Sequence, residues 1–351
     1  MKTYTRQYET PPAKMVNNGK FTFGTFNGPF KTINMLDAKK PLPLSVPKLL
    51  KYMRLKEWEA FQIGNGDYFI LGAIYNAKLM GVVQLVVIDI KKNKKYIFEK
   101  LLPPWKPIVG TSLLNQVSYS AGRKFSFHLH NHLEQDRIRV TIRTQGQKGQ
   151  PDLNCWFEAS HKKEDTTPIV ICQPFGPNRA LYSHKALMPL TGELEIGGEK
   201  IPFTKERGFM ILDDHKGYYP FEMKYDWITT AGHDQDGRLT GFNLTDNQVQ
   251  DHETYNENCL WIGNTTHLLP PIKFSRPDGA MGKWYIKDSY GRVDIEFTPE
   301  IEGKVDINAL LFKTKYRAPY GRFSGFITDD DGNRVSFDQF YGMGEDKYIR
   351  S

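Results

Sequence analysis

Residues 125–130 read FSFHLH, with an apolar side chain at every second position. In an extended segment the two Phe and the Leu therefore share one face, and the polar residues share the other. Residues 138–143 (IRVTIR) and 293–297 (VDIEF) repeat this pattern. Alternation with period two predicts β-strands that are buried on one face.

Clusters of turn-forming residues separate such runs along the chain. Examples are residues 64–67 (GNGD), 197–198 (GG) and 329–333 (DDDGN). Many short strands between turns of this kind predict an all-β fold. Because no short repeat of fixed period is present, we expect two antiparallel β-barrel or sandwich halves rather than a propeller or a solenoid.

One short helix is expected near residues 46–56. Apolar residues there follow the i, i+3, i+4, i+7 spacing of a helix face: Val46, Leu49, Leu50 and Met53. Ser45 is placed to cap the N-terminus of this helix, and Pro47 falls in its first turn.

The chain has 351 residues, a length typical of about two domains. Residues 173–178 (QPFGPN) carry the strongest turn signal near the middle of the sequence. We therefore expect an N-terminal β domain at residues 1–182 and a C-terminal β domain at residues 183–351.

The composition is that of a soluble protein with an aromatic core. Hydrophobic residues make up 39%, aromatic residues make up 13%, and the mean hydropathy is −0.53. The longest apolar region, residues 68–90, is interrupted by polar residues and glycines, which predicts two strands and no membrane insertion. The N-terminus lacks the apolar core of a signal peptide, so we expect a cytoplasmic protein.

The charge and the cysteines exclude several classes of protein. The net charge of +7 is spread along the chain without a recognisable nucleic-acid-binding module, so no nucleic-acid partner is expected. Three cysteines without C-x-x-C spacing predict neither a disulfide framework nor a zinc site. The motifs of serine hydrolases, of Walker A loops and of dinucleotide-binding folds are absent, so no cofactor is expected.

The densest cluster of functional side chains is residues 213–220 (DDHKGYYP), directly after the apolar run 209–212 (FMIL). We expect the strand to end there, at the mouth of a barrel where clefts form. A histidine beside carboxylates suits general acid–base catalysis. The candidate catalytic residues are Asp214 and His215, and the candidate ligand-binding residues are Asp213, Tyr218, Tyr219 and Trp227. In the structural alternative, an aspartate caps a turn and the histidine binds backbone.

A second cluster is residues 257–261 (ENCLW). In a strand Glu257 and Trp261 would share one face, where they would bind a polar group on an otherwise apolar ligand. Glu257 is therefore a third catalytic candidate, and Asn258 and Trp261 are further ligand-binding candidates. The alternative is a tryptophan in the core, with Glu257 paired to a basic residue at the rim.

His128, His130 and His132 would lie on one face of a strand. Alternate residues of a strand are about 6.8 Å apart, so the outer two histidines, about 13 Å apart, could not share one metal ion. We expect a solvated or lumen-lining face here and no metal.

Several motifs together resemble one uncharacterised, mainly bacterial family, the domain of unknown function 2804. They span nearly the whole chain: Gly28-Pro29, residues 54–59 (RLKEWE), 214–217 (DHKG), 257–261 (ENCLW), 297–299 (FTP), 321–325 (GRFSG) and 342–345 (GMGE). The resemblance implies no particular reaction, because none is assigned to the family.

The Asp-His-x-Gly pattern is also distantly similar to carotenoid 1,2-hydratases and related lipocalin-like proteins, a group that includes fungal Diels–Alderases. This resemblance implies two lipocalin-like β domains with a ligand site near their junction, and it would place Asp214 and His215 in that site. The hydratases carry Asp-His-Asn-Trp-Gly, whereas Lys216 directly precedes Gly217 here. The missing tryptophan would have to be replaced by Tyr218, Tyr219 or Trp227.

Three hypotheses about function follow. The first is a lipocalin-like protein that binds a mainly hydrophobic small molecule, such as a lipid or terpenoid, with a cofactor-independent hydratase, isomerase or cyclase activity in which Asp214 orients His215. The second is a glycoside hydrolase or lyase that acts on a glycan through Glu257 and Asp213 or Asp214. The third is a non-catalytic carrier. The oligomeric state is left open.

Overall fold

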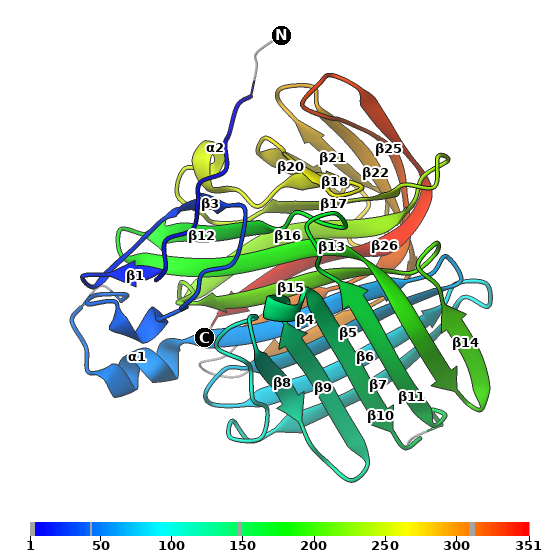
Figure 1. Cartoon of the computed structure of the whole chain (residues 1–351), viewed down its shortest axis with the longest axis horizontal. Helices are drawn as coiled ribbons and strands as arrows, with labels where there is room; N and C mark the ends of the chain where they lie inside the picture. The colour runs from blue at the N-terminus through cyan, green and yellow to red at the C-terminus, as the bar shows by residue number, and fades with distance from the viewer. Residues whose placement is uncertain (1–3, 43, 147–148, 309–312, 351) are drawn as a thin grey trace.

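The computed structural model describes residues 4–42, 44–146, 149–308 and 313–350. Two large, curled antiparallel sheets form most of this part of the chain, and a short N-terminal β-ribbon and two short α-helices lie beside them (Figure 1). The predicted all-β fold with two barrel-like halves is therefore confirmed.

The first sheet is built from the N-terminal part of the chain, and its edges are β7 and β8. Its strands along the main path are β7 (Lys94–Leu102), β6 (Gly81–Asp89), β5 (Tyr68–Asn76), β4 (Lys56–Gly64), β15 (Phe209–Gly217), β13 (Arg179–Ile196), β11 (Leu153–Ser160), β10 (Arg137–Thr144), β9 (Phe125–His132) and β8 (Gln116–Ser120). Three more strands extend it: β12 (Ile169–Gly176) and β14 (Glu199–Phe203) pair with β13, and β3 (Gly24–Phe26) pairs with β12.

The second sheet is built from the C-terminal part. Its strands in order are β19 (Thr265–Leu268), β18 (Cys259–Ile262), β17 (Leu239–Asp246), β16 (Glu222–His233), β26 (Arg334–Arg350), β25 (Tyr320–Thr328), β22 (Val293–Ile301), β21 (Trp284–Asp288) and β20 (Ile272–Ser275). A ribbon of β23 (Lys304–Asn308) and β24 (Lys313–Arg317) pairs with the end of β26. The separate N-terminal ribbon is β1 (Val16–Asn17) with β2 (Lys20–Phe21).

The change from one sheet to the other comes between Gly217 and Glu222. The expected domain boundary after residue 182 falls inside β13, which is wholly part of the first sheet, and the division into domains stays a prediction. β13 changes neighbours along its length, from β15 up to Pro189 to β11 from Leu190 onward. Gly192 adopts a φ of +155° there, and a Cβ would lie 2.2 Å from the Trp156 carbonyl oxygen, so only glycine allows this close approach.

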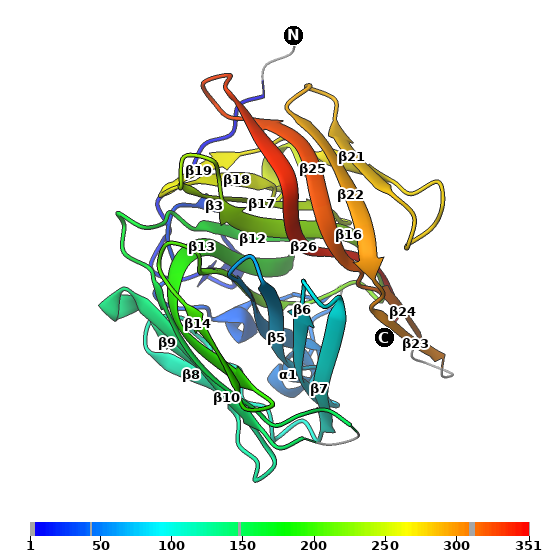
Figure 2. The ribbon, with the colours of Figure 1, turned by 90° about the vertical axis from the view of Figure 1, so that its right-hand side faces the viewer.

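The core forms three main layers because the two sheets lie face to face (Figure 2). One apolar cluster fills the curl of the first sheet, a second lies between the sheets, and a third fills the curl of the second sheet. Met210 of β15 points into the first cluster and Ile211 points into the second. β15 is therefore buried on both faces, which explains its unbroken apolar run.

The short helix near residues 46–56 is present as α1 (Lys48–Arg54). Two details of its prediction are wrong. Pro47, not Ser45, is the N-cap residue, and no side chain caps the helix. The expected apolar face is not buried either: Leu49 is 69% exposed and Leu50 is 47% exposed, because no sheet packs over this helix. The second helix, α2 (His252–Tyr255), is a single turn.

The predicted turns at residues 64–67, 197–198 and 329–333 each join two paired antiparallel strands, as expected. Residues 68–90 form two strands, as predicted. Within the described ranges, neither helix has the length and apolar character needed to cross a bilayer.

Candidate functional site

The sequence suggested that this strand ends at Leu212, but β15 runs on to Gly217. The Asp-Asp-His-Lys motif therefore lies within a buried strand in the middle of the first sheet, not at a strand end. Because side chains alternate along a strand, Asp213 and His215 point to one face while Asp214 and Lys216 point to the other. The motif is divided between two separate polar clusters.

The first cluster lies on the face of β15 that meets the second sheet. His215 Nε2 is 2.7 Å from Asp213 Oδ1 and 3.0 Å from Ser183 Oγ. Lys185 Nζ donates to the same Asp213 oxygen at 2.6 Å. Ser183 and Lys185 stand directly across from His215 and Asp213 in the β13–β15 register, so the pairing of two neighbouring strands builds this cluster.

Glu257 joins this cluster from the second half of the chain. The Ser183 hydroxyl donates to Glu257 Oε2 at 2.7 Å. The same oxygen lies 3.8 Å from Lys185 Nζ and 3.7 Å from His215 Nε2. All of these side chains are buried, so the cluster is a polar site enclosed between the two sheets. We refer to Ser183, Lys185, Asp213, His215 and Glu257 as the intersheet cluster.

Groups of opposite charge face each other in the intersheet cluster. Burial alone would raise the pKa of Asp213, but His215 and Lys185 outweigh it and hold that pKa well below its ordinary value. Burial alone would lower the pKa of Lys185, but Asp213 and Glu257 raise it. Asp213 is therefore an ionised carboxylate and Lys185 is an ammonium ion at neutral pH.

Aromatic rings cover the histidine. The indole of Trp58 stacks on the His215 imidazole with ring centroids 4.5 Å apart, and Tyr219 stacks on the same indole at 5.6 Å. Two buried polar atoms at this place have no hydrogen-bond partner in the described chain, namely His215 Nδ1 and the Tyr219 hydroxyl. Burial raises the pKa of Tyr219 well above its ordinary value, so its hydroxyl keeps its proton.

Trp227 forms another wall. Lys185 Nζ lies 5.3 Å from the centre of its ring. The Trp227 indole N–H donates to Asn243 Oδ1 at 2.6 Å, and Asn243 Nδ2 donates to the Glu257 carbonyl at 2.9 Å. Asn243 thus ties the tryptophan and the backbone of Glu257 to β17.

A second cluster lies on the opposite face of β15, inside the curl of the first sheet. Asp214 binds Lys216 Nζ through both carboxylate oxygens, at 2.5 and 2.7 Å. Glu59 lies beside this pair and accepts a hydrogen bond from Ser118. Burial, reinforced by Asp214, raises the pKa of Glu59 to about 8. The Asp214 carboxylate lies on the opposite face of β15 from the His215 ring, and Asp213, on the same face as that ring, takes the position that was expected of Asp214.

The remaining predicted ligand-binding residues lie apart from the intersheet cluster. Tyr218 packs in an apolar cluster with N-terminal residues, and its hydroxyl donates to the Met35 carbonyl at 3.3 Å. The Asn258 side chain is held by two backbone groups: its Oδ1 accepts from Thr245 N–H, and its Nδ2 donates to the Pro270 carbonyl. Trp261 lies in the apolar core between the sheets.

Sequence reasoning missed Ser183, Lys185 and Trp58 as members of this site. A signal for Lys185 existed, because it is a charged residue within the otherwise apolar run 180–190 (ALYSHKALMPL). Trp58 belongs to the RLKEWE motif, and the register of β4 and β15 sets it directly opposite His215. The RLKEWE motif on β4 and the DHKG motif on β15 are thus neighbours in space although they are far apart in sequence.

The three histidines of β9 form a stacked row, with His128 and His132 each about 6 Å from the His130 ring. Their strand is buried on the other face, so the row is half-exposed, as expected for a solvated face. In the described ranges, no three His, Cys, Asp or Glu side chains are grouped so that they could hold a metal ion.

Comparisons with known proteins identify one similar solved structure and one matching family model. No curated protein matches the sequence. Among solved structures, the crystal structure of kievitone hydratase from Nectria haematococca is similar, with a TM-score of 0.46 and 12% identity over 84% of this chain and 89% of that chain. A likeness of this degree assigns no role to any residue. The family model described as domain of unknown function (DUF2804) matches residues 6–350, so this chain belongs to that family, as its sequence motifs had indicated.

Proposed function

We propose that this protein is an acid–base enzyme that acts on a mainly hydrophobic small molecule, with His215 as the proton carrier. One observation carries the proposal. Nε2 of His215 is held by Asp213, while Nδ1 is buried and has no partner among the described residues. A histidine with one nitrogen anchored on a carboxylate and the other nitrogen unoccupied has the arrangement of a general base.

The neighbouring charges favour this role. When Nδ1 takes a proton, the imidazolium lies against Asp213, which Lys185 and His215 keep ionised. The cluster then contains two cations, Lys185 and His215, and two carboxylates, Asp213 and Glu257. A buried cluster of balanced charge lowers the cost of forming the imidazolium between the two sheets.

The chemistry balances without a redox partner. In an isomerisation, Nδ1 removes a proton from one carbon of the ligand and returns it to another. In a hydration, the imidazolium gives its proton to an alkene carbon, water adds to the neighbouring carbon, and the proton lost by that water returns to Nδ1. Positive charge that develops on the ligand is stabilised by the faces of Trp58 and Tyr219.

The aromatic walls support a mainly hydrophobic ligand. The intersheet cluster is bordered by Trp58, Tyr219 and Trp227 and by the apolar core between the sheets. A glycosidase mechanism is less well supported. It needs a sugar between two carboxyl groups, one of which is a protonated acid. Here Lys185 and His215 each approach both Asp213 and Glu257, and Asp213 is ionised.

Proton transfer to a ligand can be tested in heavy water. The His215→Gln variant should retain an unreacted ligand, which native mass spectrometry identifies after gentle purification. That ligand is then incubated in D2O with wild-type protein, with His215→Gln and with the control His128→Gln, whose side chain lies on the half-exposed face of β9.

We expect wild type and His128→Gln to incorporate solvent deuterium into carbon-bound positions of the ligand or product, and His215→Gln to slow this by at least about a hundredfold. Equal binding by all three proteins without incorporation would identify a carrier and refute the enzyme proposal. A co-purified glycan would favour the carbohydrate hypothesis instead.

A further inference from the structure

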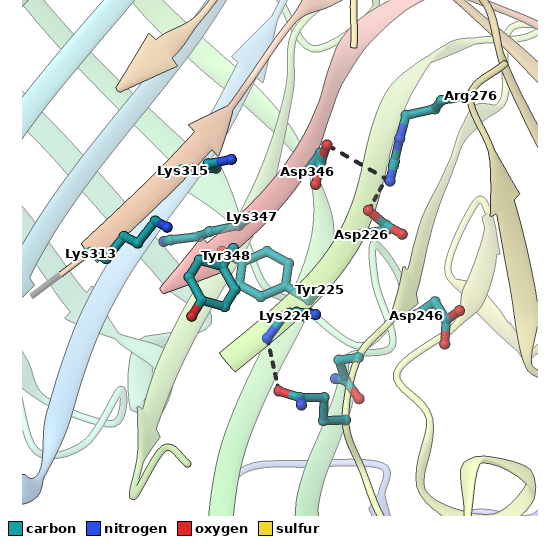
Figure 3. Close-up of a pocket in the computed structure, with 12 residues that line it drawn as sticks. Lys224, Tyr225, Asp226, Asp246, Arg276, Lys313, Lys315, Asp346, Lys347 and Tyr348 are labelled. Atoms are coloured by element: carbon teal, nitrogen blue, oxygen red, sulfur yellow. Dashed lines mark hydrogen bonds and ion pairs between the residues drawn. The ribbon is translucent and has the colours of Figure 1, made fainter. Parts of the chain in front are cut away.

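A pocket of about 570 Å³ opens at one end of the second sheet (Figure 3), and no residue of the intersheet cluster lines it. Its walls come from the ends of β16, β24 and β26, from Asp246 at the end of β17 and from residues 247–248 after it, so strands distant in sequence meet around the pocket. Arg276, which follows β20, closes one side. No function discussed so far uses this pocket.

The acidic side chains of the pocket are already paired. Arg276 Nη1 lies 2.6 Å from Asp226 Oδ1, and its Nη2 lies 3.9 Å from Asp346 Oδ2. Asp246 binds Lys273 at 2.8 Å. Each of these three carboxylates therefore has a basic partner, with Arg276 shared by two of them, and Figure 3 shows the dashed lines that join Arg276 to Asp226 and Asp346.

Four further lysines line the pocket: Lys224, Lys313, Lys315 and Lys347. None of them forms an ion pair with a carboxylate of the described chain. The pocket therefore has an excess of positive charge. In a concave site such an excess attracts anions and is screened by salt.

Three of these lysines lie beside aromatic rings. Lys224 Nζ and Lys313 Nζ lie 5.7 and 6.0 Å from the centre of the Tyr348 ring. Lys347 Nζ lies 5.0 Å from Tyr316 and 5.5 Å from Tyr225. The pocket thus combines ammonium groups with aromatic surface, which suits a ligand that has both an anionic group and a planar or apolar body.

We propose that this pocket binds a small organic anion, with its charged oxygens among Lys224, Lys313 and Lys315 and its planar body against Tyr348. Both a carboxylate and a phosphate ester offer the oxygens that lysine ammonium groups bind. This binding is independent of proton transfer at His215, and it holds whether or not the protein is an enzyme.

Isothermal titration calorimetry at 50 mM NaCl tests the site with three probes that share one ring system. The probes are 2-naphthoate, 2-naphthyl phosphate and the neutral 2-naphthalenemethanol. We expect at least one anion to bind at least tenfold more tightly than the alcohol and to weaken at 500 mM NaCl. The tighter of the two anions identifies the preferred charged group.

The pocket variant is Lys313→Gln/Lys315→Gln, and the charge-matched control is Lys31→Gln/Lys40→Gln, at exposed positions of the N-terminal region. We expect the pocket variant to lose at least tenfold in affinity for the tighter anion and the control to retain it. Lys224→Gln gives a second, single-site test in case the double variant folds poorly. Unchanged binding in Lys224→Gln and in a folded double variant would overturn the proposal. It would equally be overturned if the alcohol bound as tightly as both anions, or if neither anion bound at millimolar concentration.

Discussion

The indole of Trp58 lies on the imidazole of His215, with ring centroids 4.5 Å apart and ring planes inclined by 21°. The two residues face each other across the β4–β15 ladder. The indole is also 5.9 Å from Lys347 Nζ, and Lys347 lines the basic pocket. Trp58 therefore contacts one residue of the candidate acid–base site and one residue that lines the candidate anion site.

Removing the Trp58 ring should slow proton transfer at His215. A cation over an aromatic face gains about 1 kcal/mol or more, and a loss of 1.4 kcal/mol corresponds to tenfold in rate. We expect Trp58→Ala to reduce deuterium incorporation about tenfold and Trp58→Phe to reduce it less. The matched control is Trp156→Ala, because Trp156 is exposed on β11. A Trp58→Ala rate equal to that of Trp156→Ala would show that the stack has no part in proton transfer.

Asp213→Asn should destabilise the fold strongly. It leaves Lys185, whose side chain is 2% exposed, without its nearest carboxylate. Breaking a buried ion pair on one side costs about 3–5 kcal/mol, whereas an exposed pair contributes about 0–1 kcal/mol. The control is Asp67→Asn, which removes surface pairs with Lys91 and Arg207. In urea unfolding, the free energies of unfolding of the two variants should differ by about 2 kcal/mol or more. Equal midpoints would contradict the assignment of Asp213 to a stabilising buried ion pair.

Glu59 should make the protein less stable as the pH rises from about 4.5 to about 8. Burial raises its pKa from 4.5 to about 8, so in this window the unfolded chain has released a proton that the folded protein retains. The free energy of unfolding then falls by up to about 1.4 kcal/mol per pH unit from this one group.

The Glu59→Gln variant should remove that slope, while the exposed control Glu134→Gln should keep it. The measurement is urea unfolding at pH 5, 6, 7 and 8, and the quantity compared is the difference between wild type and each variant. If this difference for Glu59→Gln did not change with pH, Glu59 would be ionised in the folded protein as well.

Asn243→Ala should lower stability, because Asn243 holds both Trp227 and the backbone of Glu257 in place. The change leaves the buried Trp227 N–H and the Glu257 carbonyl without their partner, each at a cost of about 1–3 kcal/mol. Asn264→Ala is the control, because Asn264 also lies in an Asn-x-Thr sequence but is exposed. Thermal unfolding should show a clear decrease in melting temperature for Asn243→Ala and almost no decrease for Asn264→Ala. Similar melting temperatures would mean that other groups can hold Trp227 and Glu257.

The exposed face of α1 should tolerate polar residues. Leu49→Ser and Leu50→Ser remove apolar side chains that no sheet covers. Surface substitutions of this kind change stability by about 0.5 kcal/mol or less, in contrast to the several kcal/mol typical of a core leucine. A loss of more than about 2 kcal/mol in chemical unfolding would show that the helix face is buried in solution.

Much of the fold could be predicted from local patterns. The FSFHLH run, the turn at residues 329–333 and the two strands within residues 68–90 all adopt the predicted form. Periodicity and turn chemistry are properties of a few consecutive residues, so they can be read without knowing what packs against them. The helix at α1 follows the same rule, but its apolar spacing could not reveal that no sheet lies over it.

The candidate site was predicted only in part. Asp213, His215 and Glu257 were identified because their residue types stand out in the sequence, and the structure brings these three together. The direction of each side chain depended on whether β15 ended at Leu212. When the strand continues, alternation sends Asp214 away from His215 and gives Asp213 its place.

Residue types and alternation along the chain were thus sufficient for the all-β architecture and for the motifs that bear charge. The partners of those charges depend on strand register and on the packing of one sheet against the other, which join positions far apart in sequence. Ser183 and Lys185 reach His215 and Asp213 through the β13–β15 ladder, and Glu257 arrives from the segment that leads into β18 of the second sheet. Such contacts form only when the whole chain folds. Burial between the two sheets then makes each of these polar groups costly in free energy unless it has a hydrogen-bond or ion-pair partner.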